Sequence, residues 1–327
     1  MRSFKKVIVT GGAGFIGSEL VLLLLREGFK VVVIDDLSKG DRSRLPERDN
    51  DNFSFLLADL RDRDTALKVI KDCDWVMHLA SQAYGIAYCS RCQSETFILN
   101  NQINANVIEA VNNNVIPGML AVSSSCVYSD DAPDEMIEDN GFLGEPENGN
   151  WAYGWAKRML EVGVTAAVKD KRFSGVIVRP VNVYGASYGW FGENSHVIPS
   201  LAKRILDGEN PVVIWGDGNQ ARSFMHVEDV SRAFLELSLK APNGTVVNLG
   251  DEKAISVNGL FDAMKELFTV NPQVKYDLTK PVGRKVKSVS SDRLRKIIPD
   301  FQPRIPIREG LREMKKWYER HKAQGSF

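Results

Sequence analysis

The side chains with the clearest chemical potential are a tyrosine and a lysine placed four residues apart, Tyr153 and Lys157. Residues i and i+4 of a helix lie on one face, so the phenol and the ammonium would be neighbours. A nearby positive charge favours phenolate and lowers the pKa of a tyrosine. We therefore expect Tyr153 to take a proton from a substrate hydroxyl, with Lys157 as its electrostatic partner.

A glycine-rich segment, Thr10-Gly-Gly-Ala-Gly-Phe-Ile-Gly17, lies between a strand-like run and a predicted helix over 18–26. Glycines at 11, 14 and 17 lack the Cβ atoms that would keep a diphosphate from the backbone amides and the helix N-terminus. The second predicted strand ends in Asp35 and Asp36. A carboxylate there accepts hydrogen bonds from ribose hydroxyls and repels a 2′-phosphate, which favours NAD over NADP.

Both motifs need a scaffold that holds them, and the first half of the chain alternates short β-branched runs with helix-length segments. This alternation is typical of parallel strands joined by crossover helices, so we expect a doubly wound α/β fold with a parallel sheet. The predicted strands are 7–10, 30–34, 53–57, 75–78, 119–122 and 175–178, and a further strand over 246–249 would return to the same sheet. Helices are predicted over 200–206, 228–239 and 308–322.

The composition excludes several classes of protein. The 327 residues include 42 Lys and Arg and 42 Asp and Glu, so no surplus of positive charge points to nucleic acid or an anionic membrane. No apolar run approaches the roughly 20 residues of a membrane-spanning helix, and no signal peptide is recognisable. Four cysteines are too few for a disulfide framework, and Cys89-Ser-Arg-Cys92 lacks a second ligand pair. We expect a cytoplasmic protein without a metal.

Taken together, these motifs resemble the extended short-chain dehydrogenase/reductase family, in particular its nucleotide-sugar epimerases and dehydratases. Further matching segments are His78–Ala80, Ser123–Tyr128, Arg179–Gly185, Trp215–Phe224, His226–Asp229 and Val247–Gly250. The resemblance implies a Rossmann-type NAD-binding domain over 1–184, to which 222–250 return, and a smaller, mainly nucleotide-sugar-binding lobe over 185–327. It also implies a homodimer formed through the helices around 101–113 and 153–168.

The resemblance assigns roles to individual residues. Besides Tyr153 and Lys157, the expected cofactor contacts are Gly11, Gly14, Phe15, Ile16, Gly17, Asp35, Asp36, Asp59, Leu60 and Ala80. Ser124 is expected to position the C4 hydroxyl of the sugar. Asn182, Arg222 and Arg284 are expected to contact the substrate, with Lys287 as a rival to Arg284 for the diphosphate.

Departures from the family pattern narrow the reaction. The 4,6-dehydratases carry an Asp-Glu pair where this chain has Ser125-Cys126, so dehydration is not expected. The motifs are closest to those of GDP-mannose 3,5-epimerase and GDP-L-fucose synthase, whose shared cysteine moves a proton beside a 4-ketone. By that likeness Cys126 is one acid/base, and His196, in a segment 193–199 similar to fucose synthase, is the other. Each residue also has a non-catalytic alternative. Cys126 could be a small buried residue that only packs, and His196 could be structural or bind phosphate.

The sequence therefore favours an NAD-dependent nucleotide-sugar epimerase that acts at C3 and/or C5 of a GDP-hexose through a transient 4-keto sugar. Three alternatives stay open. The first is a UDP-sugar C4-epimerase, and the second is an epimerase-reductase of the GDP-L-fucose synthase type. The third is a non-catalytic dinucleotide-binding protein, which would typically lack Tyr153 or Lys157.

Overall fold

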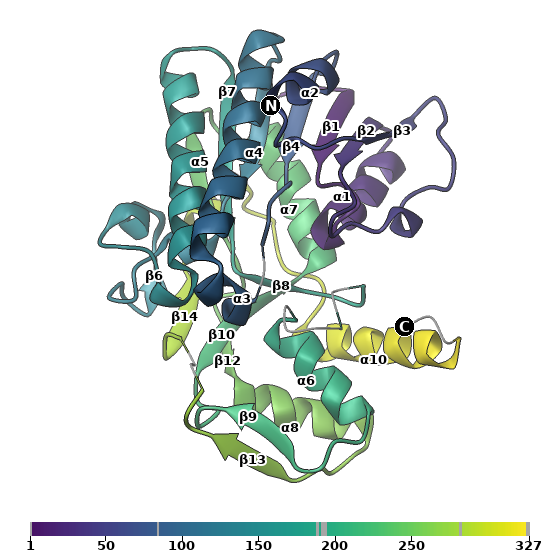
Figure 1. The fold of residues 1–327 in the computed structure, drawn as a ribbon, viewed down its shortest axis with the longest axis vertical. Helices are drawn as coiled ribbons and strands as arrows, with labels where there is room; N and C mark the ends of the chain where they lie inside the picture. Colours follow the sequence, from purple (N-terminus) through teal and green to yellow (C-terminus); the bar gives the residue numbers. More distant parts are fainter. Residues whose placement is uncertain (1, 84, 188–189, 191–194, 281–282, 325–327) are drawn as a thin grey trace.

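The computed structural model describes residues 2–83, 85–187, 190, 195–280 and 283–324 (Figure 1). The first two residues of the segment 193–199, which carries His196, lie outside these ranges.

A seven-stranded sheet in the order β11-β7-β5-β4-β1-β2-β3 forms the larger part of the molecule, and all its neighbouring strands run parallel. Its strands are β1 Lys6–Thr10, β2 Lys30–Asp35, β3 Phe53–Leu57, β4 Trp75–His78, β5 Gly118–Val122, β7 Ser174–Pro180 and β11 Thr245–Leu249. The predicted doubly wound α/β fold is confirmed, and every strand predicted for this sheet is present.

Helices cover both faces of this sheet, which explains why its central strands are mainly apolar. One face packs on α1 Phe15–Arg26 and α7 Val227–Lys240, and the other on α2 Arg63–Val69, α4 Gln93–Asn113 and α5 Trp151–Lys169 (Figure 1). β4 and β5 are buried along their whole length, so their residues are apolar or small except for His78, whose ring is hydrogen-bonded to Thr10 and Asn104. The carboxyl ends of the parallel strands meet at one edge of the sheet, beside the smaller lobe (Figure 1).

The smaller lobe contains a second sheet that the sequence analysis did not predict. Its path is β12-β10-β14-β6, with β8 paired to β10, and a separate pair joins β9 to β13. These strands are β6 Glu135–Met136, β8 Asn182–Tyr184, β9 Val212–Trp215, β10 Ala221–His226, β12 Ala254–Ser256, β13 Val274–Asp277 and β14 Val286–Val289. They have at most six residues and several are polar, so they give little period-two signal.

Helices α6 Val197–Leu206, α8 Val257–Phe268 and α10 Ile307–Ala323 surround the core of this lobe. The remaining helices of the described chain are α3 Ile86–Arg91, just before α4, and α9 Asp292–Ile297. Strand β6 comes from before residue 184 yet pairs with β14, so chain segments cross between the two parts. The division at residue 184 stays a prediction.

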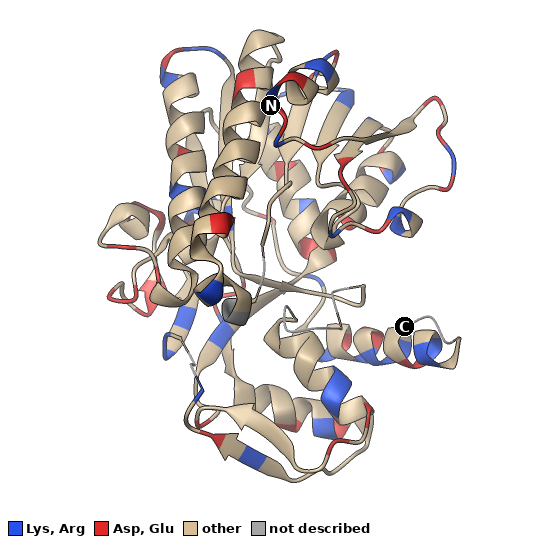
Figure 2. Ribbon diagram, viewed as in Figure 1, with Lys and Arg blue, Asp and Glu red and all other residues tan. Residues whose placement is uncertain are grey.

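Charged residues of both signs are spread over both parts of the molecule (Figure 2). Lys and Arg segments on β10 and β14 lie side by side in that view, in agreement with the parallel pairing of Arg222 with Lys287. No helix of the described residues is long and apolar enough to cross a lipid bilayer.

Candidate active site

A cavity of about 1540 Å³ lies at the carboxyl edge of the large sheet, where the two parts of the molecule meet. Small-molecule sites usually measure roughly 300–1,000 Å³, so this volume suits a dinucleotide together with a second ligand. The predicted catalytic residues Ser124, Cys126, Tyr153, Lys157 and His196 all line it. The predicted cofactor and substrate contacts line it as well, namely Gly11, Gly14, Phe15, Ile16, Gly17, Asp35, Asp36, Asp59, Leu60, Ala80, Asn182, Arg222 and Arg284.

The glycine loop forms one end of the cavity. Gly11 has a φ of 69°, and a Cβ there would stand 2.7 Å from the amide nitrogen of Ala80. A Cβ on Gly17 would meet the Gly11 carbonyl at 2.1 Å, so both positions require glycine for the loop to close onto the sheet. Gly14 caps α1 in an extended conformation without a side-chain cap, which leaves the helix N-terminus facing the cavity for an anion.

The acidic residues after β2 and β3 are held in place by hydrogen bonds. The backbone amide of Ala13 donates to Asp35 Oδ2 and that of Leu37 donates to Asp35 Oδ1, both at a distance of 2.9 Å. Asp36 accepts from the Ser38 amide at 2.9 Å. The guanidinium of Arg61 binds Asp59, with Nη2 at 2.6 Å from Oδ2. A dinucleotide ribose would therefore meet the fixed carboxylates of Asp35 and Asp36, while Arg61 binds Asp59 and lies 4.0 Å from Asp36.

Tyr153 and Lys157 share one face of α5, as expected, but their electrostatics differ from the expectation. Lys157 Nζ lies 5.5 Å from the centroid of the Tyr153 ring and donates to the Val122 carbonyl at 2.9 Å. Burial raises the pKa of Tyr153, and hydrogen bonds from Ser81 and Ser124 offset this only in part. Burial also lowers the pKa of Lys157, to about 8. The expected lowering of the tyrosine pKa is therefore wrong here, because desolvation outweighs an ammonium placed over the ring face.

The turn that carries Ser124 and Cys126 follows β5 directly. Ser124 caps a short 3-10 helix, Ser125–Val127, with its Oγ accepting from the Cys126 amide at 3.1 Å. A buried ion pair supports this turn from below: Arg179 on β7 donates to Glu161 on α5 at 2.8 and 2.7 Å. The same glutamate accepts from Ser123 Oγ at 2.5 Å, so the turn is tied to the face of α5 that carries Tyr153.

The sequence analysis named Lys287 only as a rival to Arg284 for the diphosphate, and it missed the pair that Lys287 forms with Glu147 beside the thiol. Lys287 on β14 donates to Glu147 Oε2 at 2.8 Å, and its Nζ lies 3.6 Å from Cys126 Sγ. Glu147 sits in the segment before α5 and carried no motif, although its placement shortly before Tyr153 could have suggested a site residue. Burial, reinforced by Glu147, raises the pKa of Cys126 to about 12, so the thiol is protonated at rest.

His196 stands at the N-terminal end of α6, where its exposed side chain lines the cavity. Partial enclosure in the cavity, and next the positive charge of Lys39, lower the pKa of His196, although the side chain is still open to solvent.

The three predicted substrate contacts make different bonds. Asn182 donates to the Ser223 carbonyl at 3.0 Å, and Arg222 Nη1 donates to the Ala221 carbonyl at 2.8 Å. Arg284 donates to the carbonyls of Ser129 at 2.8 Å and Ala132 at 2.6 Å. Much of its guanidinium is thus used to tie β14 to the loop after residue 128, and a diphosphate contact from Arg284 stays a prediction.

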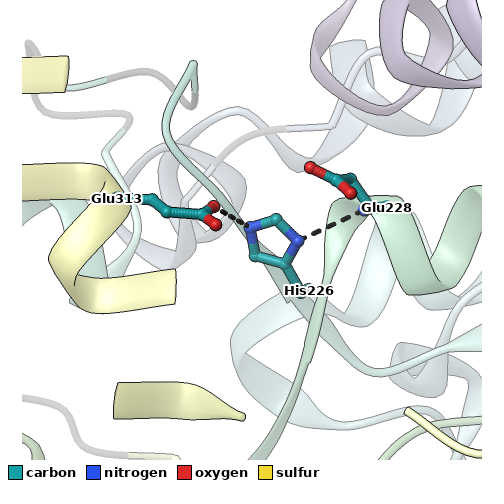
Figure 3. A group of neighbouring side chains, drawn as sticks. All are labelled: His226, Glu228 and Glu313. Atoms are coloured by element: carbon teal, nitrogen blue, oxygen red, sulfur yellow. Dashed lines mark hydrogen bonds and ion pairs between the residues drawn. The ribbon is translucent and has the colours of Figure 1, made fainter. Parts of the chain in front are cut away.

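Among the described residues, one group of His, Cys, Asp and Glu side chains has ligand atoms within 4.8 Å of one another: His226, Glu228 and Glu313 (Figure 3). His226 Nδ1 accepts from the Glu228 backbone amide at 3.4 Å, and Nε2 lies 3.4 Å from Glu313 Oε2. A neutral histidine that accepts at Nδ1 carries its hydrogen on Nε2, which leaves no lone pair for a cation. The group instead links the start of α7 to α10 (Figure 3).

Comparison with known proteins places the chain in a family. Residues 7–250 match the NAD dependent epimerase/dehydratase family. The chain is 31% identical over 317 residues to a putative UDP-glucose 4-epimerase of Methanocaldococcus jannaschii, covering 95% of this chain and 97% of the relative. It is 28% identical over 319 residues to a probable GDP-L-fucose synthase of Oryza sativa subsp. japonica, covering 96% and 92%.

Solved structures agree with this placement. A UDP-N-acetylglucosamine 4-epimerase of Methanobrevibacter ruminantium, in complex with UDP-N-acetylmuramic acid, superposes with a TM-score of 0.88 at 30% identity, over 98% of this chain and 100% of that one. The UDP-glucose 4-epimerase of Thermotoga maritima with UDP-glucose gives 0.88 at 25% identity, over 97% and 99%. The chain therefore belongs to the NAD-dependent epimerase/dehydratase family. It is an enzyme with an extended short-chain dehydrogenase/reductase fold, and NAD is its cofactor.

Proposed function

We propose that this protein epimerises a nucleotide sugar of the GDP-hexose type at C3 and/or C5, through a transient 4-keto sugar. The observation that carries the proposal is the position of Cys126, whose thiol lies in the cavity wall between Ser124 and the pair of Glu147 and Lys287. A cysteine kept only for packing would not need buried charges beside it. His196 supplies a second proton-transfer group in the same cavity.

Oxidation at C4 begins with the hydroxyl proton, which Tyr153 accepts as a phenolate. Because burial raises the pKa of this phenol in the free chain, the positive charge of NAD, when bound, would have to lower it. Ser124 orients that hydroxyl, and Lys157 supplies positive charge beside the phenol. The glycine loop and the Asp35 edge would hold NAD, which would supply a reversible hydride acceptor for C4. The residues fit this cofactor because Gly11 and Gly17 bring the loop close to the sheet and leave the N-terminus of α1 to the diphosphate.

A ketone at C4 acidifies the C–H bonds at C3 and C5. The neutral imidazole of His196 is suited to accept the proton from carbon, because its pKa lies below neutral pH. The thiol of Cys126 is suited to donate a proton to the other face, because it is protonated at rest. Accepting on one face and donating on the other inverts the carbon, and the later reduction at C4 leaves no net redox change.

The second candidate is a C4-epimerase, which the UDP-sugar 4-epimerases among the similar proteins favour. In that reaction the 4-keto sugar turns over and receives the hydride on its other face, so Cys126 and His196 need not move protons. An epimerase-reductase that consumes NADPH is disfavoured by the negative edge at Asp35 and Asp36. A non-catalytic dinucleotide-binding role is disfavoured by membership of an enzyme family and by the intact pair of Tyr153 and Lys157.

The direct test is to incubate the purified enzyme with GDP- and UDP-hexoses and to identify the products by NMR. We expect C3 or C5 epimers from a GDP-hexose, and loss of about 10²–10⁴-fold in turnover for Cys126→Ser with NAD binding intact. Cys73 is half-buried and does not line the cavity. The variant Cys73→Ser is therefore the matched control and should turn over normally. A Cys126→Ser enzyme that makes a C4 epimer at the normal rate would favour the second candidate.

We further propose a homodimer that forms across α5. An apolar stripe runs along the outer face of this helix at intervals of three or four residues: Trp151, Trp155, Met159, Val162 and Ala166. Trp151, Met159 and Val162 are 38, 39 and 47% exposed, and the neighbouring helix α4 adds Phe97 at 39% and Ile98 at 49%. A continuous apolar surface on packed helices is typical of a protein interface.

A further inference from the structure

Lys287 and Glu147 form a nearly buried ion pair beside the thiol of Cys126. Their side chains are 8 and 11% exposed, and the Nζ to Oε2 distance is 2.8 Å. Lys287 Nζ also contacts Cys126 Sγ at 3.6 Å. The three residues come from β14, the segment before α5 and the turn after β5, so the fold brings them together from distant parts of the chain.

Packing does not explain this arrangement. Removing two charges from water costs several kcal/mol per ion, and an apolar pair of similar volume is often as stable or more stable. Lys287 also pairs in register with Arg222 on the neighbouring strand, which adds a like charge nearby. Of the cysteines that the structure describes, Cys126 is the one that lines the cavity, and it is the one that Lys287 contacts.

We propose that Lys287, held by Glu147, is a positioning residue for proton transfer at Cys126: its ammonium stabilises the thiolate that remains when the thiol gives its proton to a ring carbon. The inference rests on the proposed function, in which Cys126 is the proton donor. In this step the S–H bond breaks and a C–H bond forms from the electron pair of the enolate. The negative charge moves from the sugar to sulfur, 3.6 Å from the ammonium.

Glu147 has two effects in this scheme. It holds the Lys287 ammonium beside the sulfur, and its own negative charge opposes the thiolate, so the thiol stays protonated until it is needed. The other polar groups around Cys126 are Ser124, whose Oγ accepts from the Cys126 amide, the phenol of Tyr153 and the more distant charge of Lys157. Cys126 and Glu147 keep Lys287 charged, since together they raise its pKa against the opposing effect of burial.

The test compares how readily the Cys126 thiol ionises in each variant, from the rate of its alkylation by iodoacetamide at the same fixed pH, followed on the Cys126 peptide by mass spectrometry. The reagent is neutral, so local charge does not steer it. In Lys287→Met the pKa of Cys126 should rise, so less thiolate is present and alkylation at a fixed pH should slow by about 10–1,000-fold. In Glu147→Gln the pKa should fall and alkylation should become faster. Lys287→Arg keeps the charge and should restore a pKa near that of the wild type.

Opposite shifts are the result that a purely structural ion pair would not give. Loss of local packing would make the thiol more accessible in both variants and change the two rates in the same direction, and that result would overturn the inference. An unchanged pKa in Lys287→Met would overturn it too. The matched control is the exposed pair of Lys240 and Glu236 on α7, whose Lys240→Met and Glu236→Gln variants should leave the Cys126 pKa unchanged.

A second measurement separates this inference from the proposed function. Wild-type enzyme in deuterium oxide with the GDP-hexose substrate should place deuterium on C3 or C5, and Lys287→Met should do so at least about tenfold more slowly. If the wild type labels carbon and Lys287→Met labels it equally fast, the role of Lys287 is wrong and the proposed function stands. If the wild type places no deuterium on either carbon, the proposed function is wrong and the role of Lys287 falls with it.

Discussion

Tyr153 is the residue on which oxidation at C4 depends. It is the phenol in the cavity wall beside Ser124 and Lys157, and Tyr153→Phe removes the proton acceptor while keeping the ring. We expect turnover to fall by about 10²–10⁴-fold, because general acid–base groups typically contribute that much. Tyr276→Phe, on the exposed β13, is the control and should leave turnover unchanged. NAD affinity should be kept in both variants, and a Tyr153→Phe enzyme with normal turnover would contradict the assignment.

His78 gives the fold a dependence on pH. Its ring is buried between Thr10 Oγ1 at 2.7 Å and Asn104 Oδ1 at 3.1 Å, and burial lowers its pKa to about 3. The unfolded chain, with a histidine pKa near 6.5, binds a proton more readily than the folded one below that pH. The free energy of unfolding is therefore unaffected by His78 above pH 6.5 and falls as the pH drops below it, by about 2 kcal/mol at pH 5.

Denaturant unfolding at pH 7 and pH 5 measures this contribution. His78→Gln should lose less stability than the wild type between the two pH values, while His321→Gln, on α10, should behave as the wild type does. An equal loss in His78→Gln and the wild type would show that His78 does not carry the effect.

Single residues were predictable where spacing alone decides contact. Tyr153 and Lys157 share a helix face because they are four residues apart, and local sequence contains that information. Their pKa values were not predictable, because burial depends on segments far away in the chain. Glu147 and Lys287 could not be paired for the same reason, since 140 positions separate them.

At the scale of elements, the outer face of α5 makes a specific prediction. Val162→Glu places a charge in the apolar stripe. Val162 is 47% exposed in one chain and would be buried in a dimer. We expect the variant to be a folded monomer, because an unpaired buried charge is costly only when the interface forms. Light scattering or sedimentation of the wild type and the variant measures this.

Leu278→Glu, on a residue that is 74% exposed in the smaller lobe, is the control for a charge added elsewhere. It should remain a dimer. A monomeric wild type, or a dimeric Val162→Glu, would rule out an interface across α5.

The central strands of the large sheet were predictable because they are buried on both faces and therefore form apolar runs in the sequence. The second sheet was not. Its strand β10, Ala-Arg-Ser-Phe-Met-His, mixes charged and apolar residues because it packs on a core on one side and borders the cavity with Arg222. Polar residues that line the cavity, such as Arg222, interrupt the apolar pattern by which such a strand would be recognised in the sequence.

At the scale of the whole molecule, the negative edge of the large sheet sets the cofactor preference. A 2′-phosphate would approach Asp35 and Asp36, whose carboxylates are fixed by backbone amides. Arg61 lies 4.0 Å from Asp36, but its guanidinium is already bound to Asp59. We expect NAD to bind at least about tenfold more tightly than NADP, a difference of about 1.4 kcal/mol. Calorimetric titration of both cofactors measures the ratio, and Asp36→Asn should reduce it. Equal affinities in the wild type would contradict this account and favour the epimerase-reductase.

The whole cavity, with a hydride-transfer end at Tyr153 and two proton-transfer groups at Cys126 and His196, makes one claim above the others: hydrogen on the sugar ring is exchanged with solvent during turnover. The most direct measurement is the position of deuterium in the product formed in deuterium oxide, read by NMR and mass spectrometry. Epimerisation through Cys126 and His196 predicts deuterium at C3 or C5. A C4-epimerase carries its own hydrogen to the cofactor and back, so an epimerised product without deuterium at either carbon would contradict the account.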